Sequence, residues 1–176
     1  MAKHYDFEFV LSEASVQKLV SELKKYQNDI KKAKDVILES LAEETYRQVR
    51  ANIEATTGNN GYIPTGQLLD SIVKSPIMND MISVYTNLAY AKFVEYGTGI
   101  VGSQDSHPTA TDAGWQYDSN GHGVMGWRYQ GSDGTVYWTQ GLEAHSFMYN
   151  AWLYLKENYM DIARRVLRER GIIKWM

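Results

Sequence analysis

Hydrophobic residues recur at helical spacing near both ends of the chain. A first helix is expected near the N-terminus, capped by Ser12 or Ser15. Its apolar positions are Val16, Leu19, Val20 and Leu23. The pattern blurs over residues 26–29, so we expect a break there before a second, longer helix. The apolar stripe of that helix advances in steps of three and four residues and comprises Ile30, Ala33, Ile37, Leu41, Thr45, Val49 and Ile53.

Shorter elements are expected on either side of these helices and between them. Residues 5–12 and 81–86 alternate apolar and polar side chains, as strands do, and residues 72–75 begin another strand. Residues 65–72 predict a short helix with Thr65 as its N-cap. Residues 89–95 are apolar and fit a helix or a strand equally. Helical spacing returns at Ser146 and predicts a C-terminal helix that ends near Gly171, with Phe147 and Trp152 assigned to the core.

Glycine is concentrated in one stretch, which has ten of the 14 glycines within residues 97–144. This stretch holds one basic residue, Arg128, against five acidic ones. Residues 124–139 read as a β-hairpin around Asp133-Gly134, a typical hairpin turn. We therefore expect a single domain over residues 1–176 with a glycine-rich arm at residues 100–140, because long loops in compact domains are usually functional.

Composition narrows the possible functions. The 176 residues carry a net charge of −3, so the protein does not bind nucleic acid through an overall positive charge, although a local basic patch is possible. The chain has no cysteine, which excludes disulfides, thiolate nucleophiles and cysteine-ligated metals. Neither a signal-peptide core nor an apolar stretch of membrane-spanning length is present, so we expect no membrane partner. Aromatic residues are abundant at 12%.

No catalytic constellation stands out, and we expect no enzyme, metal or cofactor. Two other functions stay open. A small metal-dependent hydrolase would use His107, His122 and the nearby aspartates, although solvated loop residues explain them more simply. A DNA-binding module would use Arg164, Arg165, Arg168 and Arg170, although cations at a helix C-terminus also suit the helix dipole. The glycine-rich segment 97–102 lacks a Rossmann context, so we interpret it as a hinge or the start of a loop.

Three segments, in this order, resemble motifs of one protein family. Residues 65–72 (TGQLLDSI) resemble its "TG-x-L-x-x-SI" element, residues 90–99 (YAKFVEYGTG) its "YA-x-x-VE-GTG" element, and residues 144–151 (AHSFMYNA) its closing "A-x-x-F-hydrophobic-x-x-A" element. The family is that of tail-component or neck proteins of long-tailed bacteriophages, also called tail-completion or head–tail joining proteins. The long 100–140 insertion departs from its simpler members.

The resemblance implies an α+β fold, in which a small antiparallel sheet is packed by a long N-terminal helix and a C-terminal helix. The hairpin would extend from it as an arm. It also implies a structural virion protein without an active site, made in the host cytoplasm and located at the neck. The protein would form a homo-oligomeric, hexameric ring between head-closure or connector proteins and the tail terminator or tail tube. DNA would pass through the ring during genome ejection without specific binding.

A ring protein functions through its interfaces, so we expect aromatic anchors on the arm. The alternative is that these aromatics cover the domain's own core. Glu95 either caps a turn, pairs with a basic residue of a neighbouring subunit, or is an exposed rim carboxylate. The full set of interface candidates is Trp115, Tyr117, Trp127, Arg128, Tyr129, Tyr137, Trp138 and Glu95.

Overall fold

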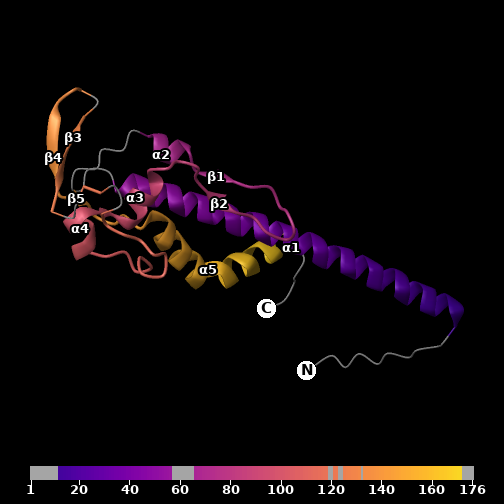
Figure 1. Cartoon of the computed structure of the whole chain (residues 1–176). Coiled ribbons are helices and arrows are strands. Elements are labelled where there is room, and N and C mark those ends of the chain that lie inside the picture. The colour runs from indigo at the N-terminus through magenta and orange to yellow at the C-terminus, as the bar shows by residue number, and fades with distance from the viewer. Residues whose placement is uncertain (1–11, 57–65, 119–120, 123–124, 132, 172–176) are drawn as a thin grey trace.

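Two long helices form the frame of the protein. The computed structural model describes residues 12–56, 66–118, 121–122, 125–131 and 133–171. Helix α1 (Glu13–Ala55) and helix α5 (Phe147–Glu169) lie side by side and run antiparallel, because the start of α5 contacts α1 near Asn52 whereas its end lies near Ile30 (Figure 1). Small antiparallel strands and short helices cover one end of this pair, which confirms the predicted α+β class.

Helix α1 is continuous, so the predicted break at residues 26–29 is wrong. No glycine or proline occurs between residues 13 and 55 to interrupt its backbone hydrogen bonds. The apolar pattern blurs there because this part of the helix is exposed. Ser12 is the N-cap, as expected, and forms a reciprocal capping box with Ser15 (Ser15 N to Ser12 Oγ 3.2 Å, Ser12 N to Ser15 Oγ 2.9 Å). The helix ends at Ala55, where the turn-forming residues begin.

A short helix and a two-stranded sheet follow α1. Helix α2 (Gln67–Asp70) has Gly66 as its N-cap instead of Thr65, and Gly66 adopts a left-handed φ of 79°. Thr65 and residues 5–11 of the strand expected over residues 5–12 lie outside the described residues, and Ser12 is the N-cap of α1. Strands β1 (Val73–Lys74) and β2 (Val84–Tyr85) pair antiparallel and confirm the two strands expected here.

The glycine-rich region is more ordered than its composition suggests. Helix α3 (Ala91–Tyr96) resolves the ambiguous apolar stretch as a helix. The hinge interpretation of residues 97–102 is wrong, because helix α4 (Gly99–Gln104) begins there. Strands β3 (Trp127–Gln130) and β4 (Val136–Thr139) confirm the hairpin and project away from the helices in Figure 1, and strand β5 (Gly141–Leu142) follows.

The three motifs meet in one hydrophobic core. Each supplies buried side chains that pack against the C-terminal half of α1, and partly buried residues such as Tyr46, Leu88 and Met148 complete the cluster. Within the described part of the chain, no helix has the length and apolarity to cross a membrane. The fully buried members of the core are Val49, Ile53, Leu68, Ile72, Ala91, Val94, Phe147 and Ala151.

The core assignment of Phe147 is confirmed, with an exposed fraction of 1%, but that of Trp152 is wrong because Trp152 is 49% exposed. Trp152 lies on the outer face of α5, where its ring contacts Tyr149 and Lys156. We expect Phe147→Ala to lower the free energy of unfolding by about 3–5 kcal/mol, because it removes a buried ring and leaves a cavity. Trp152→Ala should cost far less. Denaturant unfolding of both variants measures this contrast, and equal losses would contradict the packing described.

A buried carboxylate also links the two long helices. Glu44 on α1 accepts hydrogen bonds from Arg47 (2.6 Å) and Gln48 (3.2 Å), and it interacts with Tyr154 on α5. Burial alone would raise the pKa of Glu44, but these hydrogen bonds outweigh burial and lower the pKa below its ordinary value of 4.5. The ionised form therefore stabilises the fold.

This lowered pKa predicts a pH dependence. A carboxyl group whose pKa is lower in the folded state contributes stability above its unfolded pKa and loses it as the pH falls through the folded pKa. We expect Glu44→Gln to be less stable than the wild type at pH 7, and the difference to shrink below about pH 4.5. Thermal unfolding from pH 7 to pH 3 tests this. Glu39→Gln, an exposed change on the same helix, is the control, and a difference independent of pH would contradict the prediction.

Candidate interaction surface

Glu95 anchors the start of helix α5. Its side chain is buried at the end of α3, and its carboxylate accepts hydrogen bonds from the backbone N–H groups of Met148 and Tyr149, each at 2.9 Å. The N-cap residue of α5, Ser146, makes no side-chain capping bond. Glu95 thus supplies the cap from a distant part of the chain and places a negative charge at the positive end of the helix dipole. The alternative of an exposed rim carboxylate is wrong.

His107 completes this buried site. Its Nε2 lies 3.2 Å from Glu95 Oε1, and its Nδ1 lies 3.1 Å from the backbone nitrogen of Thr109. Since the Thr109 N–H must donate, Nδ1 is the acceptor and Nε2 carries the proton that is donated to Glu95. Both ring nitrogens of His107 are therefore hydrogen-bonded, and its ring contacts those of Tyr96 and Tyr149.

The two histidines of the hydrolase alternative do not share a site. His122 stacks on Trp127 of the hairpin at 5.7 Å, whereas His107 is buried against α3 and α5. Among the described residues, no group of three or more histidine, aspartate or glutamate side chains is placed to hold a metal ion.

The GTG segment holds the base of the hairpin against the body. Thr98 and Gly99 bridge to Leu142 and Gly141, and the two backbones approach so closely that only glycine fits. A Cβ added at Gly99 would lie 2.2 Å from the carbonyl oxygen of Gln140, and Gly99 also has a left-handed φ of 64°. The glycines of this motif therefore position the segment that leads from the hairpin into α5.

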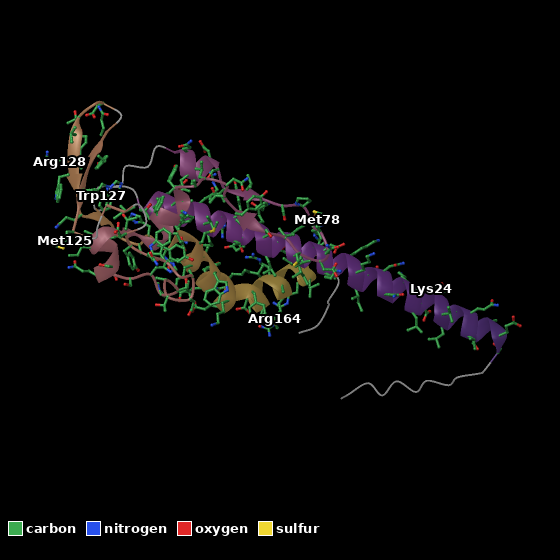
Figure 2. The ribbon with its side chains drawn as sticks, viewed as in Figure 1. Lys24, Met78, Met125, Trp127, Arg128 and Arg164 are labelled. Atoms are coloured by element: carbon green, nitrogen blue, oxygen red, sulfur yellow. The ribbon has the colours of Figure 1, made fainter. Side chains whose placement is uncertain are left out.

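The hairpin presents aromatic side chains to solvent. In its register Arg128 faces Trp138, and Tyr129 faces Tyr137 with ring centroids 5.7 Å apart. Trp138 is 61% exposed, whereas Trp127 is partly covered. Figure 2 shows Trp127 and Arg128 on the projecting hairpin and Met125 near its base. Sequence reasoning missed Met125 and Val136, which are also exposed; their apolar character beside the aromatics was the available signal.

Asp133 fixes the turn of the hairpin. Its carboxylate accepts hydrogen bonds from the Thr135 backbone N–H at 3.0 Å and from the Tyr137 hydroxyl at 2.8 Å. The backbone bond and the Tyr137 bond lower the pKa of Asp133 below its ordinary value of 3.8. The turn is therefore held by an ionised carboxylate at neutral pH, which presents the aromatic rings in a set arrangement.

The other interface candidates lie elsewhere. Trp115 and Tyr117 are half-buried, and Trp115 donates a hydrogen bond to the Gly97 carbonyl at 3.0 Å and stacks on Tyr96. Trp115 contacts Phe93 and Tyr96 of α3, and the Tyr117 carbonyl accepts a hydrogen bond from the Gly99 N–H, so this part of the 100–140 segment lies against the body. The C-terminal arginines are exposed along the end of α5, where Arg164 pairs with Asp161 at 3.1 Å.

The glutamate of the second motif thus caps the helix of the third, and all three motifs contribute to one core. Comparison with known families identifies one match. Residues 17–97 match the family model described as "Bacteriophage HK97-gp10, putative tail-component". The resemblance to phage tail components is therefore confirmed, and the match supports a structural role in the virion. The match includes the first motif and residues 90–97 of the second, but neither the hairpin nor the third motif. Searches of curated proteins and of solved structures find no match.

The Glu95 cap generates a stability prediction. Glu95→Gln removes the charge from the helix N-terminus. It also leaves one side-chain oxygen to accept the hydrogen bonds that Met148, Tyr149 and His107 donate to two oxygens in the wild type. We expect a loss of about 1–3 kcal/mol in the free energy of unfolding. Glu157→Gln, an exposed charge-neutralising change on α5, should alter it by less than about 0.5 kcal/mol. Chemical unfolding followed by circular dichroism checks both variants. If the two variants lost similar stability, Glu95 would not be the anchor described.

Proposed function

We propose that this protein is a structural component of the phage neck and forms a hexameric ring that joins the head-closure complex to the tail. The family match supports the coarser part of this statement, a tail component of the virion. The stoichiometry, the position at the head–tail joint and the function in tail completion belong to the proposal.

The observation that carries the proposal is the exposed aromatic hairpin. A ring requires a contact between two different surfaces of neighbouring subunits. Tryptophan, tyrosine and arginine are enriched at the energetic centres of interfaces, and the hairpin presents Trp138, Tyr129, Tyr137 and Arg128 together on a projecting element. Because Asp133 holds the turn, little conformational entropy is lost when the hairpin docks. We assign the hairpin as the arm that contacts the next subunit or the adjoining ring.

The charge of the chain is consistent with a conduit. A net charge of −3 disfavours retention of DNA, since retention by phosphate contacts requires a basic excess. In the proposed ring DNA passes during ejection without specific binding. The partners are further copies of this chain, head-closure or connector proteins on one side, and the tail terminator or tail tube protein on the other. The protein would be made in the host cytoplasm and then incorporated into the neck.

The competing functions have weaker support. The hydrolase alternative needs His107 and His122 in one site, and the structure places them in different surroundings. A DNA-binding function would rest on exposed arginines at a helix end, where one is already paired with an aspartate. The family match favours a structural, non-enzymatic protein over both.

Imaging and variants test the proposal together. Electron cryo-microscopy of virions should show a ring of this protein at the neck. Trp138→Ala should weaken assembly by roughly 30-fold or more, the effect of removing an interface anchor. Trp152→Ala, which removes the same kind of ring from α5, where it is 49% exposed, should assemble normally. Quantifying ring formation by native mass spectrometry and virion yield distinguishes the two variants. Absence of the protein from the neck, or equal effects of the two variants, would contradict the proposal.

A further inference from the structure

One side of the projecting part of α1 is a lysine face. Residues 13–30 extend beyond the other labelled elements in Figure 1, and Lys24 marks this part of the helix in Figure 2. Five lysines in and just beyond it are exposed to solvent, and none of them forms an ion pair with another described residue. The lysine face consists of Lys18, Lys24, Lys25, Lys31 and Lys32.

The five lysines form two rows along the helix. The first row repeats every seven residues, at Lys18, Lys25 and Lys32. The second row has the same repeat and lies beside the first, at Lys24 and Lys31. Because seven residues of α-helix rise by about 10.5 Å, the first row spans about 21 Å. The lysine face is therefore a straight line of positive charge.

Uncharged polar residues fill the space between the rows. Ser21 and Asn28 are exposed and lie three or four residues from lysines of both rows, and their side chains can donate hydrogen bonds to an anion. The carboxylates of this stretch, Glu22 and Asp29, lie outside the two rows, at the edge of the first. Residues 18–32 therefore carry a charge of +3 in a chain of −3, so the other residues together carry −6.

We propose that the lysine face binds double-stranded DNA through its phosphate backbone, without regard to sequence. DNA presents one negative charge per about 1.7 Å of its axis, so a straight row of cations contacts several phosphates at once. A single helix about 10–12 Å across also fits the major groove, which is about 12 Å wide. Access is open, because no other labelled element covers this part of α1 in Figure 1.

The type of cation points to phosphates instead of bases. Helix α1 has no arginine before Arg47, and arginine is the side chain that most often reads guanine. Lysine is a point charge on a flexible chain, so it contacts phosphates without reading a base. An acidic protein matches the face less well, because both signs of charge are usually interspersed on protein surfaces.

The rest of the molecule limits this binding. Its charge of −6 repels phosphates, so the contact is confined to the lysine face and DNA is not retained. Such a contact guides DNA in transit and then releases it. The inference rests on the proposed function for the source of the DNA only, because binding is a property of the free protein and uses α1, whereas the proposed ring uses the hairpin.

A salt titration of the free, full-length protein tests the lysine face. Fluorescence anisotropy follows binding to a labelled duplex of about 20 base pairs from about 25 to about 200 mM salt. We expect the logarithm of the binding constant to fall linearly with the logarithm of the salt concentration. The slope should lie between about −2 and −4.5, the latter being the value for five phosphates. Duplexes of different sequence should bind within about twofold of one another.

Paired variants separate the lysine face from overall charge. Lys25→Gln with Lys32→Gln should weaken binding roughly 10-fold and reduce the magnitude of the salt slope by about 2. Glutamine is a good helix former, so the fold is kept, and circular dichroism checks this. Arg164→Gln with Arg165→Gln removes the same charge from exposed positions of α5 and should leave binding unchanged, as should Trp138→Ala on the hairpin.

Three results would overturn the proposal. The first is no binding to the duplex at about 25 mM salt, and the second is an equal loss in the lysine and arginine variants. The third is tighter binding to anionic phospholipid vesicles or to polyglutamate than to the duplex, since either would identify a different partner. Virions without a ring of this protein at the neck would contradict the proposed function but would not change these binding constants, so the two failures are distinguishable.

Discussion

The placement of helix α5 depends on the buried carboxylate of Glu95. Glu95 ends helix α3, and its two oxygens receive both the first backbone donors of α5 and the imidazole of His107. A buried charge is costly unless it is paired and hydrogen-bonded, and here three donors and the helix dipole satisfy it. Because α5 is the helix that packs along α1, the same carboxylate sets how the C-terminal helix is joined to the rest of the core.

The glycines that follow Glu95 extend this constraint to the surface. Gly99 and Gly141 allow two backbones to meet without intervening side chains, so the strand leaving the hairpin is held against the helices that Glu95 organises. Within the hairpin, the Asp133 carboxylate accepts hydrogen bonds from Thr135 and Tyr137. A rigid projecting element with exposed aromatics is thus connected, through few residues, to the buried anchor. Through this connection, the buried second motif positions the exposed hairpin.

The sequence predicted the elements that carry strong periodic or turn signals. The helix from Ser146, the Asp133-Gly134 hairpin and the strands around Lys74 and Val84 follow from local patterns, and local patterns suffice for local structure. The wrong predictions concern segments whose structure or exposure depends on tertiary contacts. The apolar pattern of α1 blurred because residues 27–29 are exposed, and residues 99–104 form a helix whose glycines lie against the distant backbone of residues 140–142. The capping role of Glu95 joins residues more than fifty positions apart, which no local pattern encodes.

Two groups of exposed apolar residues differ in geometry. On the hairpin Tyr129, Tyr137 and Trp138 are exposed together with Val136, lie beside one arginine, and project from a two-stranded element that is not part of the core. On the projecting part of α1 they are aliphatic and follow a seven-residue repeat. Aromatic anchors suit a contact with a surface of different shape. The hairpin can therefore serve the ring contact proposed above, because its anchors project from an element outside the core.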